Sequence, residues 1–421
     1  MALLLLPVAE PAAALPQDPE PERAVTVESP ASPEDESSRD GEEAEEAGEA
    51  LEDEDAEDEA LPRTDALIPK PPGNTMVRST RLLVPGGGRL DWSVQGDWIA
   101  YDRRDADDLY DLYKTSPQGA GTVCLTCPLL EFRNAHALNP SWHPSGRLLV
   151  FQVQMRARRL DVTTTALTTP ERGLHTELWT ISADGKTFFQ LTRGEQTGAG
   201  VLDPHFSHEG NRLVWSERVA NRSGLWGDWV VRVAEFAERG GVPRLGKVRT
   251  YRPGNGRGFL VAHGFTPDDR QLVLSGNLEP GQAGTGLDLY LFDLTTQELT
   301  RLTRTLGDYD DQMHYSPAGD WFAWASDRNV PPILRGTGRS AARPIPRDVW
   351  LMNADGSGEQ RLTYFNPRNS RNPADGAVVS DLAWSPRGDQ LAVHVVRDFQ
   401  APREEIYLID LDPGLGRGFG E

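Results

Sequence analysis

Apolar and polar positions along most of the chain follow a unit that recurs six times. Each unit has an aromatic residue, a polar residue, a turn containing Gly or Asp, and then a short apolar run, as in Trp142-His-Pro-Ser-Gly-Arg-Leu-Leu-Val150. The aromatic residues that open the units are Trp92, Trp142, Phe206, Phe265, Tyr315 and Trp384. They are separated by 50, 64, 59, 50 and 69 residues. Short strands repeated at this spacing predict a propeller or a solenoid.

Each unit continues in the same order. An apolar strand headed by Asp or Glu follows, such as Glu177–Ile181, and then a turn such as Ala183-Asp-Gly185, whose Asp-Gly pair suits a tight hairpin turn. A closing strand then ends in Leu-Thr, as at Leu191-Thr192. Four antiparallel strands per unit form one propeller blade. We therefore predict an all-β, six-bladed β-propeller over residues 76–421.

The sixth unit lacks a closing strand of its own. After Leu408–Leu411 the sequence becomes rich in glycine, whereas the segment Met76–Val84 precedes the first unit and belongs to none. We predict that Met76–Pro85 forms the outer strand of the sixth blade and closes the ring. Closure would leave no unpaired strand at the end of the repeat to seed edge pairing between molecules.

Charge is distributed very unevenly. The 421 residues carry a formal net charge of −21, and Gln17–Ala60 alone, with 20 acidic residues and 2 Arg, carry −18. This stretch has no aromatic residue and is rich in Pro, Ser, Ala and Glu, so we predict that residues 17–75 are a disordered acidic segment. The segment is either a solvated tether or an electrostatic arm for a basic partner or a basic face of its own domain. Residues 61–421 are close to neutral.

The first residues resemble the back half of a secretory signal. Met1–Ala9 is apolar, and Ala12-x-Ala14 matches a cleavage pattern. No basic region precedes it, so either the start codon is placed too far downstream or the apolar end is accidental. We interpret residues 1–16 as the remnant of a signal peptide and expect a periplasmic or secreted bacterial protein.

Composition excludes several classes of protein. Two cysteines cannot form a disulfide scaffold, and the lone Cys124-Leu-Thr-Cys127 pair lacks the further ligands of a zinc site. We expect structural cysteines, disulfide-bonded if the protein is exported. Overall acidity argues against a nucleic-acid partner, and no apolar run is long enough to span a membrane. No phosphate loop, nucleophile elbow or His-Glu-x-x-His motif is present.

The repeat resembles that of TolB-type six-bladed propellers. The features shared are the Ser-Pro-x-Gly turns, the Asp/Glu-headed aromatic strands, Asn353–Gly358 and the Arg-Leu-Thr endings. The resemblance covers residues 76–421 and implies the fold, but propellers include binding modules, scaffolds and enzymes. TolB has an α/β domain before its propeller, where this chain has the acidic segment. Similar blades also gate prolyl-oligopeptidase-type peptidases, but too little sequence follows the sixth unit to hold a hydrolase domain.

Three histidines lie just before the unit-opening aromatic residues. His205, His263 and His314, with Gln312, are expected at the start of the innermost strands of blades 3, 4 and 5, facing the central channel. Oligogalacturonide lyases, which resemble this repeat, place three His and a Gln around manganese in such a channel. The resemblance therefore implies a possible site for manganese or another divalent metal. The alternative is that these side chains only hydrogen-bond the channel wall, and the one-residue offset of His263 weakens the equivalence.

Two long loops are basic and offer a second candidate site. They join the second and third strands of blades 2 and 5, so both should emerge at the same end of the channel. The arginines concerned are Arg156, Arg158, Arg159, Arg335, Arg339, Arg343 and Arg347. They would bind an anionic peptide, a glycan acid or the acidic segment of the same chain, or they are simply solvated.

These observations favour an extracytoplasmic propeller that binds or scaffolds a protein or peptide partner at its channel mouth, with no catalysis and no cofactor. A metal-dependent polysaccharide lyase that uses the channel histidines is the alternative.

Overall fold

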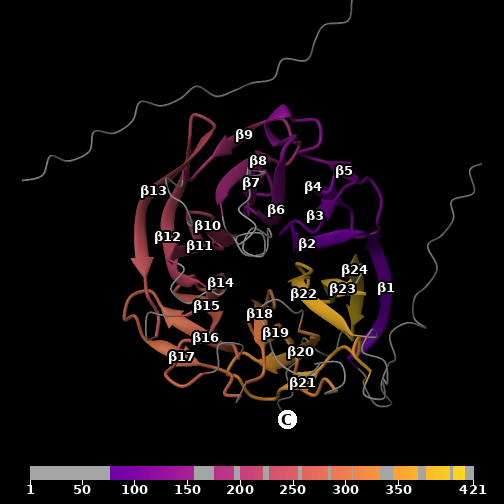
Figure 1. Cartoon of the computed structure of the whole chain (residues 1–421), viewed down its shortest axis with the longest axis vertical. Coiled ribbons are helices and arrows are strands. Elements are labelled where there is room, and N and C mark those ends of the chain that lie inside the picture. The colour runs from indigo at the N-terminus through magenta and orange to yellow at the C-terminus, as the bar shows by residue number, and fades with distance from the viewer. Residues whose placement is uncertain are drawn as a thin grey trace, which may run out of the picture.

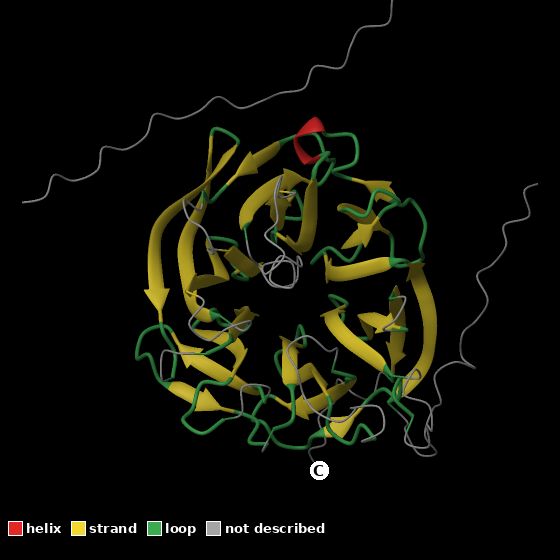
Figure 2. Cartoon of the chain, in the orientation of Figure 1, coloured by secondary structure: helices red, strands yellow, loops and turns green. Residues whose placement is uncertain are grey.

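Six four-stranded sheets form a closed ring around a central channel (Figures 1 and 2). The computed structural model describes residues 76–155, 175–193, 200–220, 227–254, 258–282, 286–305, 307–331, 345–367, 376–398 and 402–412. The predicted six-bladed β-propeller is confirmed, and its six aromatic markers each end the innermost strand of one blade. The only helical turn in the described residues is η2 (Leu130–Phe132). No described helix has the length and apolarity needed to cross a bilayer.

The strands follow the sequence from the channel outward in blades 1 to 5. Blade 1 consists of β2 (Gly87–Trp92), β3 (Ile99–Arg104), β4 (Tyr110–Thr115) and β5 (Val123–Cys124). Blade 2 consists of β6 (Ala135–Trp142), β7 (Leu148–Met155), β8 (Thr176–Ser182) and β9 (Phe188–Gln190). Blade 3 consists of β10 (Gly200–Phe206), β11 (Arg212–Ala220), β12 (Asp228–Arg239) and β13 (Val242–Tyr251).

The remaining strands complete the ring. Blade 4 consists of β14 (Leu260–Phe265), β15 (Gln271–Gly276), β16 (Asp288–Asp293) and β17 (Leu299–Arg301). Blade 5 consists of β18 (Asp310–Tyr315), β19 (Trp321–Ser326), β20 (Asp348–Asn353) and β21 (Gln360–Arg361). Blade 6 consists of β22 (Ala377–Trp384), β23 (Gln390–Arg397), β24 (Arg403–Leu411) and β1 (Val77–Pro85).

The predicted ring closure is confirmed. Strand β1 pairs antiparallel with β24, from Val77 opposite Leu411 to Pro85 opposite Glu405. Leu83, at 3% exposure, packs into the core between blades 6 and 1. The first and last strands of the domain therefore share one sheet, as Figure 1 shows where indigo meets yellow.

The recurring turn has a conformational reason. In blade 5 the Gly319 N–H donates to the Ser316 carbonyl across 2.8 Å, and Gly319 has φ +77°. Blade 6 repeats this contact between Gly388 and Ser385 at 2.9 Å, and Gly388 has φ +70°. Positive φ is least costly for glycine, so the turn selects it.

The Asp/Glu-headed strand and the Leu-Thr ending are coupled by hydrogen bonds. In blade 5 the Thr363 hydroxyl accepts the Val349 N–H at 2.9 Å and donates to the Asp348 carboxylate at 3.0 Å. Blades 1, 2 and 4 repeat the pattern through Thr126, Thr192 and Thr303. The outermost strands end just before Leu-Thr, so these residues fasten the blade rim instead of extending the sheet.

Candidate functional site

The channel histidines lie near the carboxyl ends of the innermost strands, which corrects the prediction that they lie at the starts. His205 is the last residue but one of β10, and His314 holds the same position in β18. The aromatic that follows each histidine ends its strand, because the four-residue turn begins immediately after it. The sequence pattern had placed the strand after the aromatic residue.

A bulge in each of these strands turns the histidines toward one another. Register shifts occur between Leu202 and His205, between Ala262 and Phe265, and between Asp311 and His314. Bulges redirect side chains and commonly occur beside functional sites.

His263 lies two residues before its aromatic residue, whereas His205 and His314 lie one residue before theirs. In blade 4 the register shift brings the His263 side chain beside the other two despite this offset. Gly264, with φ +116°, directly follows His263 and adopts a backbone conformation that suits glycine. The ring centroids of His263 and His314 are 6.1 Å apart, and those of His205 and His314 are 5.8 Å apart. Three blades therefore bring their histidines to one place.

A buried hydrogen-bonded chain anchors one end of this group. The Ser275 hydroxyl donates to the Asp311 carboxylate at 2.6 Å and lies 2.8 Å from Nε2 of His263, which is itself 3.2 Å from Asp311. The Arg347 guanidinium donates to the other oxygen of Asp311 at 3.1 Å. Burial acts to raise the pKa of Asp311, but His263 and Arg347 outweigh it and hold that pKa below its usual value.

Burial favours the neutral form of the other channel imidazoles by lowering their pKa values. Burial lowers the pKa of His205 to about 4, aided by the charge of His263 and opposed by Asp203. Burial, with help from both neighbouring imidazoles, also lowers the pKa of His314. His394, from the second strand of blade 6, has a pKa lowered to about 3 by burial and by the guanidinium groups of Arg89 and Arg347.

Several of these imidazole nitrogens lack a hydrogen bond within the described residues. They are Nδ1 of His263, Nε2 of His314 and both ring nitrogens of His394. Buried polar atoms are nearly always satisfied in folded proteins, so such a group calls for an explanation. These nitrogens are themselves enclosed, so they mark the groups of the channel cluster whose hydrogen-bonding capacity is unused.

Apart from Gln312, sequence reasoning missed a second set of polar side chains along the innermost strands. Counting back three residues from each unit-opening aromatic gives Arg89, Asn139, Asp203, Ala262, Gln312 and Asp381, of which five are polar. Aligning the six repeats on their aromatic residues would have revealed this position. It is also conformationally special, because Asn139, Asp203 and Gln312 have φ of 49°, 47° and 53°. Non-glycine residues in this region cluster at functional sites.

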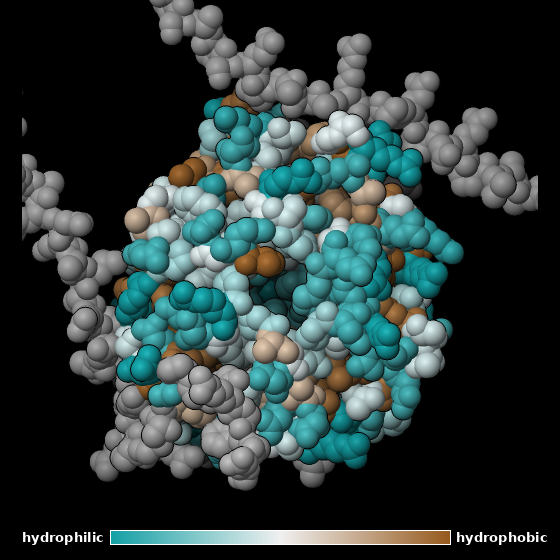
Figure 3. All heavy atoms as spheres, turned by 180° about the vertical axis from the view of Figure 1, so that it is seen from behind, coloured by the Kyte–Doolittle hydropathy of each residue, from teal (hydrophilic) through white to brown (hydrophobic). Residues whose placement is uncertain are grey.

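An ion pair and hydrogen bonds hold these polar side chains in place. Arg89 donates to Asp203 at 2.9 Å, and the Asn139 side chain donates to the same carboxylate at 2.8 Å. Asp381 accepts the Leu90 N–H at 2.9 Å, and burial raises its pKa to about 7. The channel thus holds cations, carboxylates and neutral imidazoles. Figure 3, which views the ring from the side opposite to Figure 1, shows a central hollow with mostly hydrophilic walls.

The candidate metal ligands do not form an assembled metal site. Within the described residues, the only His, Cys or acidic group whose three ligand atoms all lie within 4.8 Å is Asp111, Cys124 and Cys127. Imidazoles with unpartnered nitrogens suit a divalent ion chemically, but the described channel residues do not bring three such ligand atoms within 4.8 Å of one another. The channel is therefore not a preassembled metal site, and we derive no chemistry through one.

Of the basic loop residues, the structure describes only Arg347. Arg156, Arg158, Arg159, Arg335, Arg339 and Arg343 lie outside the described residues. Arg347 is 9% exposed and points to Asp311, so it belongs to the buried channel cluster and not to an exposed lip. The two loops do join the second and third strands of blades 2 and 5, as expected.

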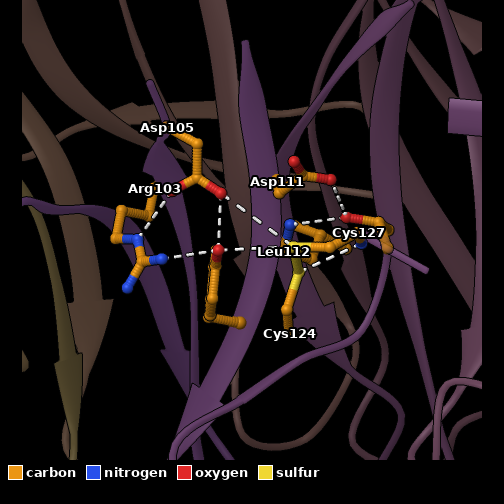
Figure 4. Close-up of a disulfide and its surroundings, with 8 residues drawn as sticks. Arg103, Asp105, Asp111, Leu112, Cys124 and Cys127 are labelled. Atoms are coloured by element: carbon orange, nitrogen blue, oxygen red, sulfur yellow. Dashed lines mark hydrogen bonds and ion pairs between the residues drawn. A yellow bond between two sulfur atoms is a disulfide. The ribbon is translucent and has the colours of Figure 1, made fainter. Parts of the chain in front are cut away.

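The two cysteines form a disulfide at the rim of blade 1, as the sequence predicted (Figure 4). Beside it, Tyr113 donates to Asp105 at 2.5 Å and accepts from Arg103 at 2.6 Å. Asp105 also accepts from Arg103 at 2.9 Å. The disulfide sits at the end of the short strand β5, far in sequence from the channel histidines, which supports a structural role.

Fold and channel together define a six-bladed β-propeller with a polar, charge-paired channel. No family model matches the chain. TolB from Acinetobacter baumannii is similar over 71% of this chain and 63% of that chain, at 14% identity and a TM-score of 0.46. A putative TolB from Agrobacterium tumefaciens is similar over 78% of this chain and 90% of that chain, at 16% identity and a TM-score of 0.45. Oligogalacturonate lyase from Vibrio parahaemolyticus is similar over 81% of this chain and 96% of that chain, at 12% identity and a TM-score of 0.46. The chain thus spans less than two thirds of the Acinetobacter protein's length, and at these identities the likeness describes the fold alone.

Proposed function

We propose that this chain is an extracytoplasmic binding and scaffolding propeller whose protein or peptide partner docks at the channel mouth. The observation that carries the proposal is the set of unpartnered imidazole nitrogens of His263, His314 and His394 beside fixed ion pairs in the channel. Such groups recognise a complementary donor or acceptor and discriminate against ligands that leave them unpaired. No cofactor is needed for this function.

The channel is also suited to binding because its side chains are already ordered. Arg89 is held by Asp203, and Arg347 by Asp311. Preorganised groups lose little conformational entropy when a ligand arrives. The arginines of the two basic loops, which we place in the same binding surface, would add attraction for an acidic partner: Arg156, Arg158, Arg159, Arg335, Arg339 and Arg343.

The buried serine of the channel does not support a hydrolase. Ser275 is fully buried, and its hydroxyl proton is directed to Asp311. A catalytic serine needs a base to accept its proton and access to substrate. Ser275 instead helps to hold the His263–Asp311 pair in place.

Site-specific photocrosslinking tests the docking site. A photoreactive residue is introduced at His205, which faces the channel, and as a matched control at His208, which lies on the turn after the same strand. We expect a crosslinked protein or peptide in native envelope extracts from position 205 and not from 208. The adduct should disappear when Arg89 is replaced by Ala. Equal adducts at both positions, or none at 205, would contradict channel docking.

The export part of the proposal is supported by the Cys124–Cys127 disulfide, because disulfides persist in oxidising compartments. The protein is expressed from its native gene in a bacterial host, its thiols are alkylated before lysis, and the cells are fractionated. We expect unlabelled cysteines and a shortened amino terminus in the extracytoplasmic fraction. A labelled, uncleaved cytoplasmic protein would overturn this part.

A metal-dependent polysaccharide lyase is the second candidate function. The observation that favours it is that His263 and His314 have unpartnered nitrogens suited to a metal ion. Elemental analysis of the purified full chain decides between the two, with an assay for unsaturated products from oligogalacturonate in added manganese. Stoichiometric metal that is lost on His263→Ala plus His314→Ala, together with product formation, would favour the lyase. Metal-free, inactive protein with unchanged stability favours the binding module.

A further inference from the structure

Blades 3 and 6 have long outer strands, β13 and the nine-residue β1, whereas the other four blades have short ones. The outer strands β5, β9, β17 and β21 have two or three residues each. Strand β13 has ten, Val242–Tyr251, and forms a long outer edge on the left of the ring in Figure 1. A long exposed edge offers unpaired backbone groups to another strand, and proteins usually cover or shorten such edges.

This edge carries a dense positive charge. Between positions 239 and 252 the chain has five basic residues and no acidic one, and all five are exposed. They are Arg239, Arg244, Lys247, Arg249 and Arg252. Arg232 on the neighbouring strand pairs with Glu217, but none of these five forms an ion pair with another described residue. The positive charge is therefore available to an acidic partner.

The centre of the edge exposes an apolar residue. Val248 is 46% exposed, and the neighbouring Gly246 lies against the Glu235 side chain of β12. A register shift in the β12–β13 ladder lies between the pairs Ala234–Val248 and Phe236–Leu245. Adding an extended segment here would satisfy the free backbone groups of β13, a common mode of peptide recognition.

The chain itself contains a segment with complementary charge and a strand-forming core. Residues Gln17–Ala60 carry −18, and within them Val25-Thr-Val27 is a short run of β-favouring residues, with Glu22 and Arg23 shortly before it and Glu28 after it. We propose that Gln17–Ala60 docks along the outer edge of blade 3, with Ala24–Val27 pairing with β13 as a fifth strand. The acidic flanks would then lie beside the basic residues of the edge. This surface is separate from the channel mouth, and the proposal is independent of the function proposed above.

The tether is long enough for this contact. The described fold begins at Met76, next to β1 in blade 6, which lies across the ring from β13 (Figure 1). A flexible chain of the length between Val27 and Met76 has a root-mean-square span of about 40 Å. A folded domain of this size has a radius of gyration of about 20 Å. The segment can therefore reach the opposite rim, and tethering raises its effective concentration to the millimolar range.

Hydrogen exchange of the full chain, measured by mass spectrometry, tests the proposal. The probe is exchange at residues 242–251 in about 20 mM and about 500 mM salt. We expect Thr26→Pro, which blocks strand pairing, to speed exchange in this peptide by about tenfold at low salt. High salt should speed exchange at residues 242–251 of the unaltered chain to a similar extent. Ala44→Pro, in the same acidic segment, is the matched control and should leave β13 protected.

Charge reversal provides the second arm. Arg244→Glu, Lys247→Glu and Arg249→Glu together should speed exchange as Thr26→Pro does, whereas Arg133→Glu, Arg270→Glu and Arg387→Glu on other blades should not. Protection of the β1–β24 pair reports whether each variant keeps its fold. Unchanged β13 exchange in both Thr26→Pro and the β13 triple variant would overturn the proposal. If charge reversal speeds β13 exchange but Thr26→Pro does not, the strand-pairing part of the proposal is wrong.

Discussion

The Arg347 guanidinium lies 3.1 Å from the Asp311 carboxylate, and this pair joins the end of the blade 5 loop to the innermost strand of the same blade. The backbone of Arg347 also bonds to blade 6, donating to Ala377 at 3.0 Å and accepting from Val379 at 3.2 Å. One residue therefore connects two blades and the channel cluster.

We expect Arg347→Ala to lower the free energy of unfolding by about 3–5 kcal/mol at pH 7, because it leaves Asp311 buried without its cation. Urea unfolding of the full chain measures this. Arg387→Ala, at an exposed turn, is the control and should change stability by less than about 0.5 kcal/mol. Equal effects of the two substitutions would show that the buried pair has no special role.

The stabilisation by Asp311 should depend on pH. Its folded-state pKa is lowered, so its contribution is present above the unfolded value of about 4 and is lost as pH falls below it. The stability difference between the unaltered chain and Asp311→Asn should therefore be largest near pH 7 and shrink below about pH 4. Denaturant titrations at several pH values give this difference, and a constant difference would contradict the assignment.

His394 should make the protein sensitive to acid. Its folded-state pKa of about 3 lies below the unfolded value of about 6.5, so the unfolded chain binds a proton first as pH falls. Stability should therefore fall between about pH 6.5 and pH 3, and His394→Leu should reduce that fall. At pH 7 His394→Leu should be nearly neutral or stabilising, because it removes two unpaired buried nitrogens. Thermal melts at pH 7 and pH 5 test both statements, and a large loss of stability at pH 7 would refute the second.

Removing Met76–Pro85 should markedly destabilise the domain. The deletion exposes the edge of β24 and the core around Leu83. Calorimetry should show a lower or broadened transition, whereas deletion of ten residues within the acidic segment should leave the transition unchanged. A melt like that of the full chain would show that closure by β1 is dispensable.

Thr363→Val should cost about 1–3 kcal/mol, because it leaves the Val349 N–H and the Asp348 carboxylate without a hydroxyl partner. Thr363→Ser keeps the hydroxyl and is the control. Urea unfolding compares the two, and equal losses would attribute the effect to packing instead of hydrogen bonding.

Much of the fold could be predicted from the sequence because the propeller repeats its local chemistry. Gly319 and Thr363 each serve a turn or a strand end that recurs in other blades, so the pattern was visible without any long-range information. Ring closure was predictable for the same reason, since Met76–Pro85 was the strand that remained after the six units had been assigned.

The site was less predictable because its geometry depends on bulges. The positive φ of Gln312 and the conformation of Gly264 decide where the neighbouring histidines point, and neither can be derived from strand periodicity. Arg347 shows the same limit, since a basic residue at the end of a basic loop gives no sign that it is buried against Asp311 in the channel.

Because β1 pairs with β24, the ring cannot close until the whole domain has been synthesised. Ribosomes add roughly 5–20 residues per second, so β1 waits about 20–60 s until its partner strand has been made. Throughout that interval β1 lacks its pairing partner, and Leu83 can contact only the blade 1 part of its core. A chain built this way benefits from a holding chaperone or from crossing a membrane unfolded, because the ring can form only after its last strand arrives.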